Sequence, residues 1–215
     1  MLLVGPTGCG KTPLGNELER LGLAGRCCRH FDFGAWLRKA AAQSEPAPFT
    51  SAEQVFIRKV LAEGALLENE HFGVALKLLR WFLSASDAGG GDWIVLNGLP
   101  RHVGQATALA PFVAVHTVAH LLCTADVVAE RIRRNTGGDR ADRGDDAPEA
   151  VRRRLATFEK RTRPLIDHYR EAGARIVDLS VGAGTTAADA RAILECSLPV
   201  PAAGKEKSHD SAYRT

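Results

Sequence analysis

The chain has 215 residues, a formal net charge of +3 and five cysteines. A chain of this length can bury one apolar core of ordinary size, so we expect a single domain. The small net charge gives no reason to expect a nucleic-acid or membrane partner. The cysteines are odd in number and lack a C-x-x-C spacing, which favours reduced thiols in a cytoplasm and gives no zinc site.

Short apolar runs alternate with longer helical patterns along most of the chain. The predicted strands are residues 1–4, 26–31, 93–97, 117–123 and 174–179. The predicted helices are residues 11–22, 34–43, 51–63, 69–85, 102–110, 125–135, 148–172 and 186–196. This alternation is typical of an α/β fold in which a parallel sheet is covered by helices on both faces.

The two ends of the chain differ in character. Met1 already begins the first predicted strand, so no signal peptide is expected. Residues 199–215 are polar and lack an apolar period, which predicts a disordered tail after a domain of residues 1–198. The most apolar stretch, residues 113–129, is interrupted by two histidines and an aspartate, so it is no candidate for a membrane span.

The first strand leads directly into the pattern G-x-x-x-x-G-K-T at residues 5–12. Glycines in such a loop allow backbone angles that a Cβ atom would forbid, so that consecutive N–H groups can face a polyphosphate. Lys11 is expected to reach the β- and γ-phosphates, and the Thr12 hydroxyl to ligate Mg²⁺. The alternative, an ordinary glycine-rich turn, is disfavoured by the strand before the loop and the helix after it. The residues expected to bind ATP here are Gly5, Gly8, Cys9, Gly10, Lys11 and Thr12.

A second polar cluster follows the third predicted strand, in the run Asn97-Gly-Leu-Pro-Arg101. In open α/β sheets, ligands bind beyond the carboxyl ends of the strands, so Asn97 and Arg101 are expected to face the same crevice as the phosphate loop. Pro100 restricts the turn that aims the Arg101 side chain. The alternative is an arginine on a surface turn.

Five segments follow one another in the order found in the nucleoside monophosphate kinases. They are the loop at residues 5–12, the run Asp32-Phe-Gly-Ala-Trp-Leu-Arg38, the segment 57–67, Asn97 to Arg101 with Gln105, and the segment 145–155. Over residues 1–195 the chain most resembles an adenylate kinase with a short lid. The resemblance implies a P-loop NTPase-type fold with a five-stranded parallel sheet. It also implies a helical lobe at residues 34–70 that binds the monophosphate, and a short lid at about residues 135–147.

The resemblance also assigns acceptor-binding residues. Arg38 matches the family arginine that holds the acceptor monophosphate, and Arg101 matches the one that lies between the two nucleotides. Leu67, through its carbonyl group, and Gln105, through its amide, match positions that contact the acceptor base.

The segment 131–163 is rich in arginine, and acids in the same span neutralise it in part. It is either a solvated helical face with salt bridges or a set of guanidinium groups that stabilise a transferring phosphoryl group. The resemblance favours the second interpretation and implies that Arg143 and Arg154 are the lid arginines. It also implies that Arg131 stacks on the ATP base. A further family arginine falls at Asn135, and the neighbouring Arg134 is a candidate substitute.

Several positions depart from the family pattern. Pro13 replaces a threonine after the lysine, and Thr12 can offset its loss by holding Mg²⁺ directly. Asn97 and Ala35 replace two acids that order the water shell of Mg²⁺. Asn97 is still expected to contact the ion through a water molecule. Phe33 replaces a threonine that contacts the acceptor base, which puts strict selectivity for AMP in doubt.

The sequence therefore favours a monomeric cytoplasmic enzyme that uses Mg²⁺ with ATP to phosphorylate a nucleoside monophosphate, with AMP as the expected acceptor. One alternative is a nucleotide-binding regulator on the same fold with weak or no turnover. Another is a phosphate-loop kinase for CMP, UMP or a different small acceptor. Replacing Asn97 by aspartate is expected to restore an acid beside the metal and raise activity, unless the site has been rebuilt around Thr12.

Overall fold

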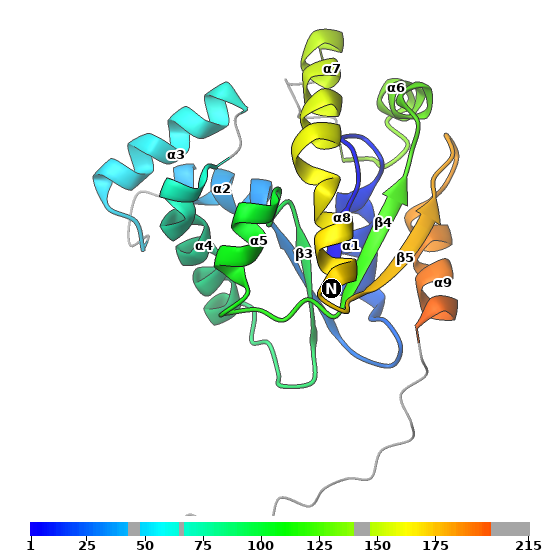
Figure 1. Cartoon of the computed structure of the whole chain (residues 1–215), viewed down its shortest axis with the longest axis horizontal. Coiled ribbons are helices and arrows are strands. Elements are labelled where there is room, and N and C mark those ends of the chain that lie inside the picture. Colours follow the sequence, from blue (N-terminus) through cyan, green and yellow to red (C-terminus); the bar gives the residue numbers. More distant parts are fainter. Residues whose placement is uncertain (43–47, 65–66, 140–146, 199–215) are drawn as a thin grey trace, which may run out of the picture.

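All five predicted strands join one parallel sheet, in the order β2-β3-β1-β4-β5 (Figure 1). The computed structural model describes residues 1–42, 48–64, 67–139 and 147–198. The strands are β1 (Leu2–Val4), β2 (Cys28–Asp32), β3 (Trp93–Asn97), β4 (Thr117–Leu122) and β5 (Arg175–Ser180). The predicted fold class is confirmed, and the predicted tail at residues 199–215 lies outside the described residues.

Helices cover both faces of the sheet. They are α1 (Lys11–Leu21), α2 (Phe33–Ala42), α3 (Ser51–Glu63), α4 (Phe72–Ala85), α5 (Val103–Leu109), α6 (Ala125–Arg134), α7 (Pro148–Thr157), α8 (Pro164–Glu171) and α9 (Ala187–Ser197), with a 3₁₀ turn η1 (Asn69–His71) and a π-helical turn η2 (Phe158–Thr162). In Figure 1, α4, α5 and α8 lie in front of the sheet, and α1 lies behind it.

The side chains of β1 show how one strand serves two cores. Leu2 and Val4 belong to the apolar cluster that includes residues of α4 and α8. Met1 and Leu3 belong to a second cluster, with residues of α1 and α9. Because successive side chains of a strand point to opposite faces, a continuous apolar run is what a strand buried on both faces requires.

The predicted helix 148–172 is divided in the structure. Its middle is the π-helical turn η2, in which the Arg163 N–H donates to the carbonyl oxygen of Phe158 at 2.8 Å. Pro164, the next residue, has no N–H, and its ring excludes the regular helical hydrogen bond at this point. The predicted helix 69–85 likewise begins as the 3₁₀ turn η1 before α4.

The parallel register brings the ends of β2 and β3 and the phosphate loop after β1 to one edge of the sheet. Asp32, the last residue of β2, pairs with Asn97, the last residue of β3. Asn97 in turn pairs with Leu3 of β1, just before the phosphate loop. The fold therefore places the loop, Asp32 and Asn97 side by side at the carboxyl edge, the location where open α/β sheets bind ligands.

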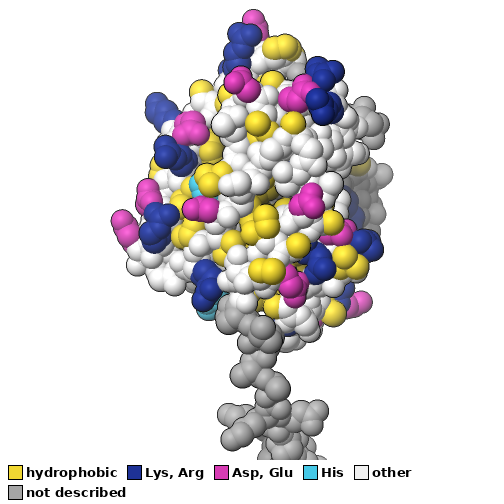
Figure 2. Space-filling view, turned by 90° about the vertical axis from the view of Figure 1, so that its right-hand side faces the viewer, with side chains coloured by type: hydrophobic (Ala, Val, Ile, Leu, Met, Phe, Trp, Pro, Cys, Tyr) yellow, Lys and Arg dark blue, Asp and Glu magenta, His cyan; other side chains and the backbone are white. Residues whose placement is uncertain are grey.

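The exterior carries a mixed charge. On the face shown in Figure 2, acidic and basic side chains are interspersed, with hydrophobic side chains between them. Among the described residues, no helix combines the length and the apolar character needed to cross a membrane. All five cysteines lie within the described residues, and each is free.

One close approach of two elements gives a test of the packing. A Cβ atom built on Gly15 of α1 would lie 2.2 Å from Nε2 of the buried His30 ring of β2. Gly15→Ala is therefore expected to lower the free energy of unfolding by about 1–3 kcal/mol, the usual cost of overpacking a core. Urea denaturation of the purified variant measures this change.

Gly73 of α4 is the matched control, because an added Cβ there meets nothing within 4 Å. Gly73→Ala is expected to stabilise the protein by about 0.5–1 kcal/mol, since alanine is the better helix former. Equal effects of the two substitutions would show that His30 does not fill the space beside Gly15.

Candidate active site

The phosphate loop joins β1 to α1 and adopts the backbone that its glycines permit. Gly8 has φ 78° and Gly10 has φ 100°, in the left-handed region that other residues avoid. The loop is also pressed against its surroundings, since a Cβ atom on Gly5 would lie 2.9 Å from the carbonyl oxygen of Leu121 in β4. Because α1 begins at Lys11, its free N–H groups and partial positive charge lie at the end of this loop.

Lys11 is held by the loop itself. Its Nζ donates to the carbonyl oxygens of Gly5 at 2.8 Å and Pro6 at 2.7 Å. Burial lowers the pKa of Lys11, with the nearby Arg101 guanidinium acting in the same direction. An incoming phosphate would offer the ammonium group charged oxygens in exchange for neutral carbonyl oxygens, which strengthens its hydrogen bonds.

A large cavity of about 740 Å³ opens at the carboxyl edge of the sheet. Cationic side chains from four parts of the chain line it, namely Lys11, Arg38, Arg101 and Arg154. They come from α1, α2, the turn after β3, and α7. The described lining also includes the acids Asp32 and Asp139. Several positive side chains in one cavity favour a ligand that carries several phosphate groups, such as a pair of nucleotides.

The two central arginines repel each other in this cavity. The pKa of Arg101 is lowered by burial and, secondarily, by the positive charge of Arg154. Arg101 is held in place through its backbone, because its carbonyl oxygen accepts a hydrogen bond of 2.8 Å from Thr162 Oγ1 in η2. A bound anion between the guanidinium groups would relieve their repulsion.

The predicted acceptor-base contacts meet in one network. Gln105 Nε2 donates to the carbonyl oxygen of Leu67 at 2.8 Å, and Gln105 Oε1 accepts from the Arg101 N–H at 2.8 Å. His102, also buried, places its Nε2 3.3 Å from the same Leu67 oxygen. Gln105 and Leu67 therefore lie together, and they line the large cavity. Phe33, which replaces a family threonine, lines it as well.

Three oxygen-bearing side chains meet beside Lys11. Thr12 Oγ1 donates to Asp32 Oδ2 at 2.7 Å. Asn97 Nδ2 lies 3.0 Å from Thr12 Oγ1 and 3.1 Å from the same Asp32 oxygen. Sequence reasoning named Thr12 and Asn97 but missed Asp32. The available signal was its position at the end of a predicted strand beside the phosphate loop, where ligand-binding residues gather.

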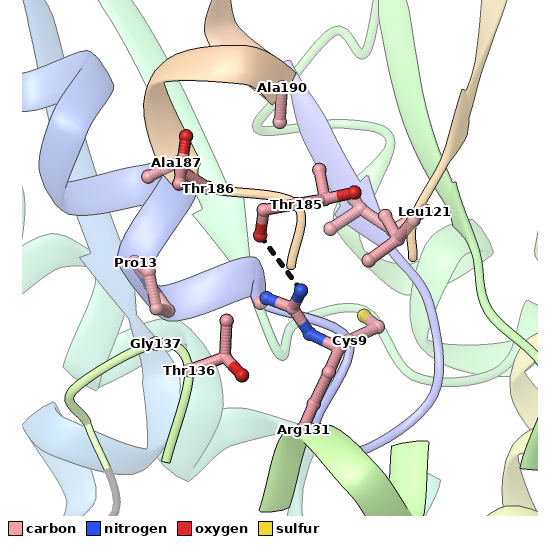
Figure 3. A pocket seen from close by; sticks show the side chains of 12 residues that line it. Cys9, Pro13, Leu121, Arg131, Thr136, Gly137, Thr185, Thr186, Ala187 and Ala190 are labelled. Atoms are coloured by element: carbon pink, nitrogen blue, oxygen red, sulfur yellow. Dashed lines mark hydrogen bonds between the residues drawn. The ribbon is translucent and has the colours of Figure 1, made fainter. Parts of the chain in front are cut away.

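A smaller cavity of about 140 Å³ lies between the phosphate loop, the residues after α6 and the loop before α9. Figure 3 shows the Arg131 guanidinium inside it, facing Thr185 and close to Cys9. Arg131 Nη1 donates to the carbonyl oxygens of Gly182 and Thr185, each at 2.8 Å, and Nε donates to that of Gly8 at 3.3 Å. These bonds lie in the plane of the guanidinium, and the Arg131 side chain is buried.

The other predicted arginines lie apart from these cavities or outside the described residues. Arg134 is exposed on α6 and paired with Glu130. Asn135, where the family has an arginine, ends α6 in a left-handed conformation with φ 49°, which asparagine tolerates better than most residues. Arg143 lies outside the described residues, as does most of the predicted lid. The catalytic roles of Arg134 and Arg143 stay predictions.

A phosphate loop at the carboxyl edge of a five-stranded parallel sheet, facing a cavity lined by arginines, defines a nucleotide kinase of the phosphate-loop class. A family model described as adenylate kinase matches residues 3–174. A curated adenylate kinase of Rhodopirellula baltica is 31% identical over 211 residues, which cover 94% of this chain and 98% of the relative. One from Stenotrophomonas maltophilia is 32% identical over 178 residues, which cover 80% and 86%.

The chain belongs to the adenylate kinase family. It is an ATP-dependent nucleoside monophosphate phosphotransferase, as the resemblance of its motifs implied.

Proposed function

We propose that the protein transfers the γ-phosphoryl group of ATP to AMP and so forms two molecules of ADP. The observation that carries the proposal is the convergence of Lys11, Arg38, Arg101 and Arg154 on one cavity beside the phosphate loop. Phosphoryl transfer needs little covalent chemistry from a protein, so positioned cations supply most of the catalysis.

Each cation has a place in this reaction. Lys11 and the loop N–H groups hold the β- and γ-phosphates of ATP, and Arg38 holds the phosphate of AMP. Arg101 and Arg154 face the space between the two nucleotides and stabilise the charge that spreads over the equatorial oxygens of the transferring group. The attacking oxygen belongs to the AMP phosphate, which is already ionised at neutral pH, so the proposal needs no general base.

The two cavities suit two different bases. The small cavity beside Arg131 receives the ATP base, with the guanidinium face as its stacking surface. The AMP base occupies the end of the large cavity near Leu67 and Gln105. In this arrangement the Gln105 amide exchanges its hydrogen bond with the Leu67 carbonyl oxygen for hydrogen bonds to the base.

The residues beside Lys11 fit Mg²⁺. This ion prefers oxygen ligands, and in nucleotide sites it is held by one or two carboxylates together with substrate phosphates. Thr12 and Asp32 offer a hydroxyl and a carboxylate within hydrogen-bonding distance of each other. When bound with ATP, Mg²⁺ neutralises charge on the β- and γ-phosphate oxygens.

The lobes around the cavity exclude water in the proposed mechanism. In this proposal most of α2 and all of α3 belong to the lobe of residues 34–70, and the lid spans about residues 135–147, most of which lie outside the described residues. Closure of both over the nucleotides would prevent hydrolysis of ATP and align the reacting phosphates. We further propose that the enzyme acts as a monomer in the cytoplasm.

A coupled assay of ADP formation tests the proposed acceptor. AMP, CMP, UMP, GMP and dAMP are each supplied with ATP, with and without Mg²⁺, and kcat/KM is compared. The proposal expects the highest kcat/KM with AMP and little transfer without the metal. A preference for CMP or UMP would favour a kinase for another monophosphate. Nucleotide binding without transfer to any acceptor would favour a regulator on the same fold.

A further inference from the structure

The contacts of Asp32 extend to both positions where the family pattern loses an acid. Its Oδ2 is 3.1 Å from Asn97 Nδ2, and its Oδ1 accepts a hydrogen bond of 2.9 Å from the Ala35 N–H. One carboxylate therefore lies between Asn97 and Ala35. The hydroxyl that it contacts belongs to Thr12, one residue before Pro13, where the family threonine would stand.

A helix cap alone does not account for this carboxylate. The bond from the Ala35 N–H to Oδ1 is the kind that caps the start of a helix such as α2. The other oxygen, Oδ2, accepts hydrogen bonds from Thr12 and Asn97, and Asp32 is among the residues that line the large cavity. A capping residue needs only one of its two oxygens.

The charge at this place also calls for a cation. Asp32 lines the cavity that holds the polyphosphate in the proposed function, and its negative charge would repel the phosphates. A divalent cation between carboxylate and phosphates turns this repulsion into attraction. The neighbouring Thr12 hydroxyl supplies a second oxygen ligand of the hard type that Mg²⁺ prefers.

Asn97 has the complementary chemistry. Its Nδ2 lies 3.4 Å from Nε2 of His30, whose Nδ1 lies 2.9 Å from Asn16 Oδ1. Because Nδ1 faces an amide oxygen, which can only accept, Nδ1 carries the proton and Nε2 is left to accept a hydrogen bond from Asn97. The ring therefore accepts one N–H of the Asn97 amide and orients the other toward Asp32 and Thr12.

From these contacts we propose that Asp32 is the acid of the Mg²⁺·ATP site, with Thr12 as the hydroxyl ligand and Asn97 as the residue that positions Asp32. The metal site has thus been rebuilt around Asp32 rather than weakened by loss of acids at positions 35 and 97. This inference rests on the proposed use of ATP with Mg²⁺.

Asp32→Asn tests the site by binding rather than by turnover. Asparagine caps helices as well as aspartate does, so α2 keeps its start and a thermal melt checks the fold. Calorimetry gives the Kd of β,γ-imido-ATP with Mg²⁺ and with EDTA, for wild type and variant. In wild type, Mg²⁺ tightens binding. In Asp32→Asn, we expect that tightening to fall by about 10- to 100-fold, while Kd in EDTA is unchanged or lower.

Asp139→Asn is the matched control, because Asp139 is the other acid among the described residues that line the cavity. It should keep the Mg²⁺ effect. The site is overturned if Asp32→Asn keeps the wild-type effect, or if Asp139→Asn loses as much. A wild-type protein that does not bind the analogue would instead overturn the proposed function, and the metal site with it.

Asn97→Asp gives a second test, and the structure reverses the expectation from sequence. The change sets a carboxylate where an amide now donates to Asp32 at 3.1 Å, and two carboxylates in contact cannot both stay ionised without cost. We therefore expect lower kcat and a higher Mg²⁺ concentration for half-maximal activity. A rise in activity would overturn the role of Asn97 as the partner of Asp32.

Discussion

Lys11→Met is expected to lower kcat for phosphoryl transfer by about 100- to 1000-fold, the usual effect of removing one preorganised donor from a transition state. Within the part of the chain that the structure describes, Lys11 Nζ bonds to carbonyl oxygens of its own loop and to Cys9. Methionine has a similar length but no charge, so the loop keeps its packing while the γ-phosphate loses its cation. A coupled assay at saturating ATP and AMP measures the loss.

Lys59→Met is the control for this substitution, because Lys59 is exposed on α3 and forms an ion pair of 4.0 Å with Glu63 of the same helix. Its kcat should stay within about twofold of wild type, as for most surface changes. Near-native activity of Lys11→Met would contradict the assignment of residues 5–12 as a catalytic phosphate loop.

Arg154→Ala is expected to lower kcat by about 1000-fold or more, the scale measured for arginines that stabilise a transferring phosphoryl group. Arg38→Ala should act differently and raise the KM for AMP by about 10- to 100-fold, the worth of a hydrogen bond between charged groups. The difference arises because Arg38 binds a phosphate that is present in both ground and transition states, whereas Arg154 acts on charge that develops during transfer.

The matched control for Arg154 is Arg153, the preceding residue of α7, which is exposed. Arg153→Ala should change neither kcat nor KM by more than about twofold. Steady-state kinetics with each substrate varied in turn separates these effects. If Arg154→Ala changed only the KM for ATP, its role in the transition state would be wrong.

The sequence predicted the centre of the sheet because β1 and β3 are short, mostly apolar runs, a pattern typical of strands covered on both faces. Strand β3 and helix α3 agree with the predicted ranges 93–97 and 51–63. The π-helical turn η2 was not predicted, since apolar spacing cannot register one extra residue in a helical turn. Pro164 was the signal that a regular helix over 148–172 could not continue.

The candidate site was predicted where residues belong to contiguous motifs. Lys11, Arg38, Arg101 and Arg154 were named from sequence, and they line one cavity. Asp32 was missed because its meaning lies in contacts with residues 20 and 65 positions away along the chain. The absence of acids at Asn97 and Ala35 was interpreted as a weakened metal site. A sequence pattern shows that an acid is missing from a position, but it does not show that an acid elsewhere in the chain lies beside that position in the fold.

The π-helical turn restricts where residues can be inserted into or deleted from this protein. In Figure 1, α7, η2 and α8 form one continuous rod, and the turn sets the rotation of α7 relative to α8. Deleting one residue between Phe158 and Thr162 would remove the extra residue of the π-helical turn and rotate α7 by about 100° relative to α8. Arg154 would then leave the cavity while α8 kept its packing on the sheet. We therefore expect relatives with this site to conserve the spacing from Arg154 to Thr162, even though much of the rod's surface faces solvent and would tolerate substitution.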